Sequence, residues 1–320
     1  MLNVYINYFV NIWKNIMEKS IAILIPCYNE EKTIKNVILD FKDIFKKSNI
    51  YVYDNNSTDN TAAIALDSGA IVRYEKKQGK GNVVQRMFSD IDADIYLLVD
   101  GDSTYDPLTA PTLVDAVANS SCEMAVASRN EVSSLAYRTG HKTGNTLLTG
   151  SVNTIFGKNI TDMLSGYRAM SKSFVKTFPI LSSGFEIETE ITIHALGLNA
   201  PVLEFESLYS QRPENSESKL QTYSDGWKIL ILILRLFRQE KPLVFFSLIS
   251  VILAVVSIGI VLPILSEYYD TGLVNKLPTA ILSMGIMLVS IISFSLGLIL
   301  DTVTTGRSEL KKLFFLNYYK

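Results

Sequence analysis

The pair Asp100 and Asp102 carries the clearest chemical signal in this chain of 320 residues. The two carboxylates flank Gly101 directly after the apolar run 95–99, which is typical of a buried parallel strand. Carboxylates placed in this way can hold one Mg²⁺ or Mn²⁺ against a diphosphate, where the cation stabilises the charge on a departing nucleoside diphosphate. The spacing therefore predicts a metal site at Asp100 and Asp102, with Asp102 as a catalytic residue.

Alternating strand and helix patterns are the elements that must position this pair. Short apolar runs predict strands, and apolar residues at helical spacing between them predict helices. The expected strands cover residues 21–26, 51–53, 70–74, 95–99 and 123–128, the expected helices cover residues 31–47, 58–68, 81–92 and 107–119, and the sheet pattern ends with residues 201–207. This βαβ alternation predicts a doubly wound, mostly parallel α/β domain of Rossmann-like type, with its ligand site beyond the carboxyl ends of the strands.

Polar residues follow other expected strands as well. Tyr28 and Glu30 come after the first strand, Asp54 ends the second, and Arg129 follows the fifth. A carboxylate at Asp54 can accept a hydrogen bond from a base N–H or a ribose hydroxyl. Lys80 lies between two glycines and is available for a phosphate. Neither GxGxxG nor GxxxxGK[ST] follows the first strand, which argues against dinucleotide and P-loop binding.

Six motifs in a fixed order extend this interpretation. They are Ile-Pro-Cys-Tyr-Asn-Glu-Glu (25–31), the Asp54 segment, Asp100-Gly101-Asp102, Ala-Ser-Arg (127–129), Ser-Gly-Tyr-Arg (165–168) and Phe-Glu-Ile-Glu (185–188). Together they resemble the family 2 glycosyltransferases of GT-A fold, in the polyprenyl-phosphate branch typified by dolichyl-phosphate mannose and glucose synthases. The resemblance covers about residues 20–240, and the two apolar runs that follow resemble the two-helix members.

The resemblance also implies roles for single residues. Pro26, Tyr28, Glu30 and Asp54 would line the nucleotide, to which we add Lys80 and Asp100 as nucleotide-sugar contacts. Arg129 and Arg138 would hold the lipid phosphate, and Arg212 and Lys219, which resemble a mobile segment near the acceptor, are further candidates for it. Arg168, in the Ser-Gly-Tyr-Arg turn, is expected to be a catalytic residue. Asp162 is either a catalytic base or the residue that orients Arg168. Some members carry a glutamine where Thr104 stands here, which leaves the third protein ligand of the metal open.

The acceptor of this branch explains the need for cations. A polyprenyl phosphate is mostly a dianion at pH 7, because the second pKa of such a phosphomonoester is about 6. A dianionic nucleophile needs cations that position it more than it needs a general base, and arginine suits bidentate binding of phosphate. The cations after the nucleotide half of the chain are Arg129, Arg138, Arg168, Arg212 and Lys219.

The resemblance implies an inverting, metal-dependent hexosyltransferase. A hexose or N-acetylhexosamine would pass from a nucleoside-diphosphate sugar, with UDP preferred over GDP, to undecaprenyl or dolichyl phosphate. The product would serve cell-surface glycan synthesis or protein glycosylation. Two alternatives stay open, a processive polysaccharide synthase of the same fold and a non-catalytic nucleotide-binding membrane subunit. The chain lacks the Gln-x-x-Arg-Trp motif of processive polysaccharide synthases. It keeps both Asp100 and Asp102, which argues against a non-catalytic nucleotide-binding subunit.

Two runs without a charged residue or histidine, 243–265 and 277–300, are long enough to cross a hydrocarbon core of about 30 Å. Lysine and arginine precede the first run and follow the second, whereas the connection 266–276 carries only Lys276 beside two acidic residues. This asymmetry predicts a multi-pass protein of the plasma (inner) membrane. The catalytic domain, 20–225, and the tail, 301–320, would lie in the cytosol.

Two further segments flank the catalytic domain. Residues 226–242 carry Lys228, Arg235 and Arg238 on one side of a helical pattern, which indicates an interfacial helix or an amphipathic helix packed on the domain. Residues 1–19 form an extension with amphipathic spacing, and either Met1 or Met17 fits as the start.

Net charge and cysteine content argue against two further kinds of binding, to nucleic acid and to zinc through thiolates. A net charge of −2 gives no reason to expect nucleic-acid binding. The two cysteines, Cys27 and Cys122, fit buried residues in a reducing compartment and no thiolate zinc site. Association into a homo-oligomer stays open.

Overall fold

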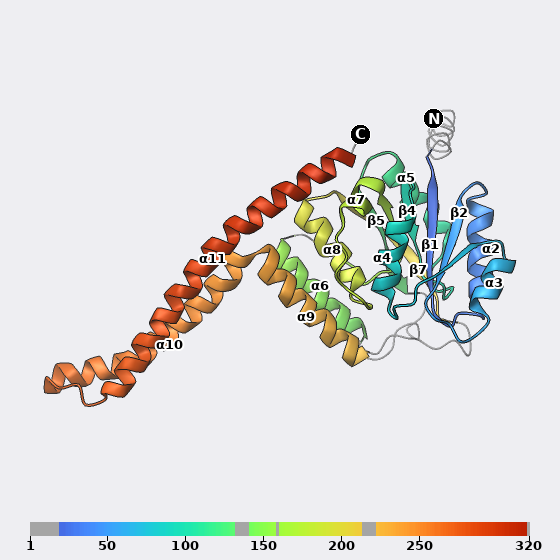
Figure 1. Ribbon diagram of the computed structural model, residues 1–320. Helices are drawn as coiled ribbons and strands as arrows, with labels where there is room; N and C mark the ends of the chain where they lie inside the picture. The colour runs from blue at the N-terminus through green and yellow to red at the C-terminus, as the bar shows by residue number, and fades with distance from the viewer. Residues whose placement is uncertain (1–18, 132–140, 158–159, 213–221, 319–320) are drawn as a thin grey trace, which may run out of the picture. The chain divides into compact units, whose positions relative to one another are not determined.

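The structure is a computed structural model that describes residues 19–131, 141–157, 160–212 and 222–318 (Figure 1). The chain forms two compact units, residues 1–232 with 311–320, and residues 233–310. Three features of the sequence-based prediction lie outside the described residues: the N-terminal extension up to residue 18, Arg138 and Lys219.

A seven-stranded sheet is the frame of the first unit. Its strands are β1 (Ile21–Cys27), β2 (Asn49–Asp54), β3 (Ile71–Tyr74), β4 (Ile95–Leu98), β5 (Met124–Glu131), β6 (Arg168–Ser171) and β7 (Val202–Tyr209). They lie in the order β3-β2-β1-β4-β6-β5-β7. Among these strands β6 alone runs against the others, because only its pairs with β4 and β5 are antiparallel. The predicted doubly wound, mostly parallel α/β domain is therefore confirmed.

Helices cover both faces of the sheet (Figure 1). Successive residues of a strand point to opposite faces, so Ile23 and Ile25 of β1 enter one core while Ala22 and Leu24 enter the other. The first core is completed by α2 (Ile34–Ile44), α3 (Thr61–Asp67) and α5 (Ala110–Ala118), which follows the short helix η1 (Pro107–Thr109). The second core is completed by α4 (Lys80–Asp90), α7 (Lys172–Thr177) and α8 (Ile187–Leu198). A further helix, α6 (His141–Phe156), precedes β6 in the chain.

Strand β6 was not predicted from the sequence. Its four residues follow the Ser-Gly-Tyr-Arg turn and are too few to show a period of two. Pairing on both sides makes the segment a strand, because Ala169 lies opposite Leu97 of β4 and Ala125 of β5. Its direction decides the environment of Arg168, the first residue of the strand.

The second unit contains α10 (Pro242–Thr271) and most of α11 (Leu277–Tyr318). These helices contain the uncharged runs of the sequence, and both are long and apolar enough to cross a membrane. Polar bonds join them, since Ser257 Oγ donates to the carbonyl of Ser283 at 2.6 Å and Ser290 Oγ donates to the carbonyl of Ser250 at 2.8 Å. A Cβ at Gly297 would lie 3.0 Å from Phe246 Cβ, so the glycine permits this close approach.

The preceding helix, α9 (Thr222–Glu240), ends against α11. The carbonyl of Gln239 accepts from Thr304 Oγ1 at 3.1 Å and from Arg307 Nη2 at 2.8 Å. Arg307 also pairs with Glu240 at 3.2 Å. These bonds satisfy a carbonyl that the end of a helix leaves without an intrahelical donor.

Candidate active site

The expected site residues gather where the parallel strands end. β1 and β2 end side by side, because Cys27 pairs with Asp54 in the register of the sheet. β6 runs in the opposite direction, so its first residue, Arg168, pairs with Leu98 at the end of β4. Residues at these strand ends therefore meet at one edge, as in other doubly wound sheets. They include Pro26, Tyr28, Glu30, Asp54, Asp100, Asp102 and Arg129.

Lys80 begins α4 and places its ammonium between two carboxylates. Its Nζ lies 2.5 Å from Asp100 Oδ1 and also pairs with Glu188 Oε1. Burial lowers the pKa of Lys80, but the two carboxylates outweigh burial and hold that pKa above its ordinary value. A Cβ at Gly166 would lie 2.6 Å from Asp100 Oδ2, so glycine leaves room for the pair. Lys80, which we expected beside a phosphate, thus fixes the orientation of Asp100.

Arg212, which follows β7, pairs with two further carboxylates. Its Nη2 lies 2.5 Å from Asp102 Oδ2, and its Nη1 lies 3.4 Å from Glu30 Oε1. The other oxygen of Asp102 accepts from the Thr104 hydroxyl at 2.6 Å and from the Thr104 amide at 3.1 Å. Burial, and then the charge of Asp100, raise the pKa of Asp102 above its ordinary value. Asp102 is therefore a buried carboxylate that depends on a neighbouring cation.

The residues at this edge fit a divalent cation. Asp100 and Asp102 offer the oxygen ligands that Mg²⁺ and Mn²⁺ prefer, and each carboxylate already has a cation of this chain as its partner. The part of the chain that the structure describes contains no group of three or more carboxylate, histidine and cysteine side chains that would hold a metal. Asp100 and Asp102 are the residues that would hold such a cation, and Thr104 donates to Asp102.

Asp54 has one buried oxygen without a partner. Its Oδ2 accepts from the Ser57 amide at 3.1 Å, but Oδ1 has no hydrogen-bond partner among the residues that the structure describes, although Asp54 is only 4% exposed. A buried carboxylate oxygen in this condition is costly unless a ligand donates to it. The neighbouring Asn55 fixes the segment before α4, because its Nδ2 donates to the carbonyls of Glu75 and Lys77 at 2.8 Å each.

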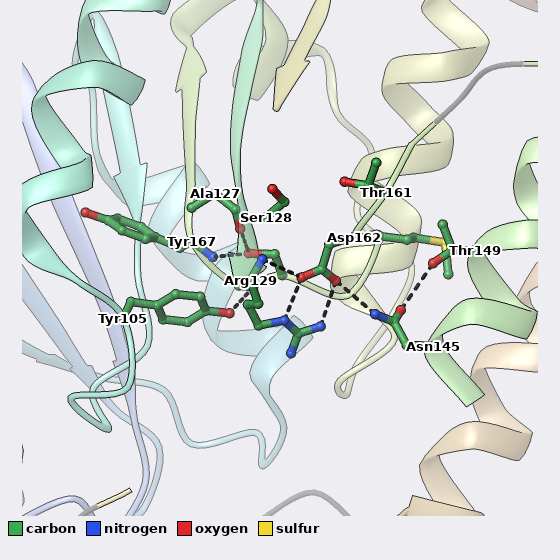
Figure 2. Close-up of polar contacts among 12 residues, drawn as sticks. Tyr105, Ala127, Ser128, Arg129, Asn145, Thr149, Thr161, Asp162 and Tyr167 are labelled. Carbon is green, nitrogen blue, oxygen red and sulfur yellow. Dashed lines mark hydrogen bonds and ion pairs between the residues drawn. The ribbon is translucent and has the colours of Figure 1, made fainter. Parts of the chain in front are cut away.

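Arg129, at the end of β5, is held by Asp162 (Figure 2). Arg129 Nε donates to Asp162 Oδ2 at 2.6 Å, and Nη2 donates to Oδ1 at 2.7 Å. The guanidinium also lies over the ring of Tyr209, 5.5 Å from its centroid. Of the two roles that the sequence left open for Asp162, the orienting one fits the geometry, but the guanidinium that its two oxygens hold is that of Arg129 and not that of Arg168. This bidentate pair sets the plane of the guanidinium.

Arg168 lies in the interior and not in the cluster of charged side chains. It is 0% exposed. Its Nε donates to the carbonyl of Ser165 at 2.8 Å, its Nη1 to Thr192 Oγ1 at 2.8 Å, and its Nη2 to the carbonyl of Met163 at 2.5 Å. Burial lowers the pKa of Arg168 from its ordinary value. The geometry gives Arg168 a role in holding the turn 163–168, and it does not place this guanidinium where a phosphate would reach it.

The sequence reasoning missed Asn145, which donates to Asp162 Oδ1 at 3.1 Å from helix α6 (Figure 2). The signal for it was present, because Asn145, Thr149 and Asn153 recur at intervals of four residues and so share one face of a helix. The same edge of the sheet includes Glu188, which the structure places beside Lys80.

Known proteins are similar to this chain in sequence and in fold. Residues 22–178 match the model of glycosyl transferase family 2. The glycosyltransferase AglJ of Haloferax volcanii is 27% identical over 92% of this chain and 97% of its own length. The dolichol-phosphate mannosyltransferase of Pyrococcus furiosus is 26% identical over 63% of this chain and 59% of its own length. A crystal structure of the glucosyl-3-phosphoglycerate synthase of Mycobacterium tuberculosis, in complex with Mn²⁺, UDP-glucose and phosphoglyceric acid, has the same fold. Its TM-score is 0.58 at 21% identity, over 71% of this chain and 82% of that one.

Proposed function

The chain belongs to glycosyl transferase family 2, and we propose that it transfers a hexose or N-acetylhexosamine from a nucleoside-diphosphate sugar to a polyprenyl phosphate. The product is a polyprenyl-phosphate sugar, a membrane-bound donor for cell-surface glycan synthesis or protein glycosylation. One observation carries this proposal. Asp100, Asp102 and Arg129 lie at the same edge of the sheet. The two carboxylates suit a metal-bound diphosphate, and the arginine suits a second phosphate. The relative named for dolichol phosphate supports this class of acceptor.

Asp54 supports a nucleotide on the β2 side of this edge. Among the described residues Asp54 Oδ1 has no donor, whereas Oδ2 already accepts from Ser57, so a ligand can donate to Oδ1. Uracil offers a single N3–H to such an oxygen, whereas guanine presents two adjacent N–H donors that would need both oxygens of the carboxylate. This difference favours a UDP-sugar over a GDP-sugar. Pro26 and Tyr28 are partly exposed at the same edge and complete the proposed nucleotide contact.

The reaction is one displacement with inversion. An oxygen of the lipid phosphate attacks the anomeric carbon in line with the departing diphosphate. A divalent cation at Asp100 and Asp102 would stabilise the charge on the leaving group. Arg129 positions the acceptor phosphate, which is already ionised and needs no base. Asp162 is therefore assigned to holding Arg129, since both of its oxygens accept from that guanidinium.

The apolar helices support a reaction at a membrane. We propose that α10 and α11 span the plasma membrane, with the catalytic unit and the C-terminal residues in the cytosol, where nucleotide-sugars are made. Polar bonds between facing serines of these helices suit a pair of helices in lipid. α9 would lie at the level of the headgroups.

A panel of UDP- and GDP-sugars, each incubated with undecaprenyl phosphate and the full chain in detergent micelles, tests the proposal. With Mg²⁺ or Mn²⁺ we expect one labelled sugar to enter the organic phase as a single glycosyl unit of inverted anomeric configuration. Asp102→Asn serves as the inactive control. Growth of a polymer would instead identify a processive synthase. Nucleotide binding with no transfer to any acceptor would identify a non-catalytic subunit.

A further inference from the structure

The polar face of α6 is not explained by the reaction itself. Thr149 Oγ1 donates to Asn145 Oδ1 at 3.1 Å, and Asn145 Nδ2 donates to Asp162 Oδ1 at 3.1 Å (Figure 2). One turn further along the same face, Asn153 Nδ2 donates to the carbonyl of Ile160 at 2.8 Å and Asn153 Oδ1 accepts from the Ile160 amide at 3.0 Å. Two side chains of one helix thus bond residues 160–162, and Thr149 bonds one of those two, Asn145.

Strand β7 holds the same segment through Glu204. Its carboxylate accepts from the Thr161 amide at 2.9 and 3.0 Å, from the Thr161 hydroxyl at 3.0 Å and from the Asp162 amide at 3.2 Å. The main chain at Asp162 is therefore fixed from β7, while its carboxylate receives an amide donor from α6. Such convergence on one carboxylate is the arrangement that fixes a side chain in a single rotamer.

The orientation of Asp162 determines that of Arg129. Asp162 is 5% exposed and makes two bonds to the guanidinium and one to the Arg129 amide at 3.2 Å. An acceptor phosphate at Arg129 would share that guanidinium with Asp162, so two anions would lie near one another. The Asn145 amide reduces this conflict, because it donates to one of the carboxylate oxygens and stabilises the negative charge there.

We propose that Asn145 is a positioning residue for the acceptor. It fixes Asp162 and stabilises the charge of that carboxylate by one hydrogen bond, and Asp162 presents Arg129 to the phosphate of the lipid. This inference rests on the proposed function, because it assigns Asn145 to the phosphate end of the acceptor site. Because Asn145 donates to Asp162 and Asp162 accepts from Arg129, we expect the effect of Asn145 to fall on the acceptor.

Two substitutions in the full chain separate this role from a merely structural one. Asn145→Ala removes the amide, and Asn145→Asp keeps its shape while placing a second carboxylate beside Asp162. The apparent KM for undecaprenyl phosphate should rise about threefold to tenfold for Asn145→Ala, as for a lost hydrogen bond, and further for Asn145→Asp. The KM for the nucleotide-sugar should stay within about twofold of the wild type.

Asn119 provides a matched control. Its Nδ2 donates to Asp115 Oδ1 at 2.7 Å at the exposed end of α5, away from any arginine pair of the site. Asn119→Ala and Asn119→Asp should leave both KM values unchanged. If Asn145→Ala fails to fold, Thr149→Val tests the same chain of bonds, with a rise in lipid KM of about twofold.

The outcomes distinguish the inference from the proposed function. A lipid KM within about twofold of the wild type for both Asn145 variants overturns the role of Asn145. An equal rise in the two KM values also overturns it, since that result marks a general structural defect. A wild-type chain that never uses undecaprenyl phosphate overturns the proposed function instead.

Discussion

The ammonium of Lys80 lies 2.5 Å from Asp100 Oδ1 and pairs with Glu188 on its other side. The side chains of Lys80, Asp100 and Glu188 are 11%, 27% and 5% exposed, so two carboxylates that are mostly removed from water share one ammonium. Arg212 stands in the same relation to Asp102 and Glu30. The acidic residues of the edge are thus held apart by cations of the chain itself, which explains how several carboxylates can gather there.

Replacing Lys80 should destabilise the fold as well as the site. Lys80→Met leaves Asp100 and Glu188 without their cation, and breaking a buried pair from one side costs about 3–5 kcal/mol of unfolding free energy. The double variant Lys80→Met/Glu188→Gln should recover part of this loss, because it removes one of the two stranded charges. Urea denaturation measures both. Arg86→Met is the control, since Arg86 pairs with Asp90 on the exposed surface of α4. Equal losses for Lys80→Met and Arg86→Met would contradict the prediction.

Turnover should depend on the two strand-end aspartates and on a divalent cation. Asp102→Asn and treatment with EDTA should each abolish transfer, and added Mg²⁺ or Mn²⁺ should restore the treated wild type but not the variant. Asp106→Asn is a nearby control, because Asp106 only caps η1 through the Leu108 amide. Full activity in EDTA would remove the metal from the mechanism.

The positions of these aspartates were predictable from the sequence, because a strand end in a parallel sheet is specified by its apolar run. The ionic partner of each charged side chain was not predictable from the sequence. Arg129 and Arg168 each end a short motif, and one of the two roles left open for Asp162 was to orient Arg168. The antiparallel strand β6 decides otherwise, since it buries Arg168 in the sheet and leaves Arg129 beside Asp162. A strand of four residues without periodicity is what sequence patterns detect least well.

The two arginines should therefore respond differently to substitution. Arg129→Ala should weaken use of undecaprenyl phosphate by about tenfold or more, the loss of a charge-assisted bond to phosphate, while nucleotide affinity holds. Arg168→Ala leaves a cavity and several acceptors without donors, so it should lower the unfolding free energy by about 3 kcal/mol or more. Steady-state kinetics and thermal melting of both variants check this contrast. A stable Arg168→Ala protein with a raised KM for the lipid would show instead that Arg168 acts in the acceptor site.

Stability should fall in mild acid through His194. This residue lies between Phe174 and Phe178, and burial lowers its pKa from 6.5 to about 3. The unfolded chain then binds more protons than the folded one below pH 6.5, so stability is complete above that pH and falls as the pH drops toward 3. Between pH 8 and pH 5.5 the loss from this residue is about 1.4 kcal/mol. His194→Phe should remove that part of the pH dependence in denaturant melts. An unchanged slope in the variant would show that His194 is not the group responsible.

Helix α9 has one buried face and one exposed face. Apolar residues of this helix are buried on one face, at Ile229, Leu232, Ile233 and Leu236. Its opposite, exposed face carries Trp227 together with Lys228, Arg235 and Arg238, a mixture of aromatic and cationic side chains that suits the headgroup layer.

Replacing these three cations with glutamate should lower transfer to undecaprenyl phosphate in liposomes of anionic lipid, because the site is then misplaced relative to the acceptor. Nucleotide binding should not change. High salt should reduce the advantage of the wild type, since exposed charges are screened within about 10 Å at 0.1 M. Charge reversal of three exposed lysines around α2, at Lys35, Lys46 and Lys47, changes net charge equally and should leave transfer intact. If both triple variants lose activity alike, net charge and not the position of α9 governs the reaction at the membrane.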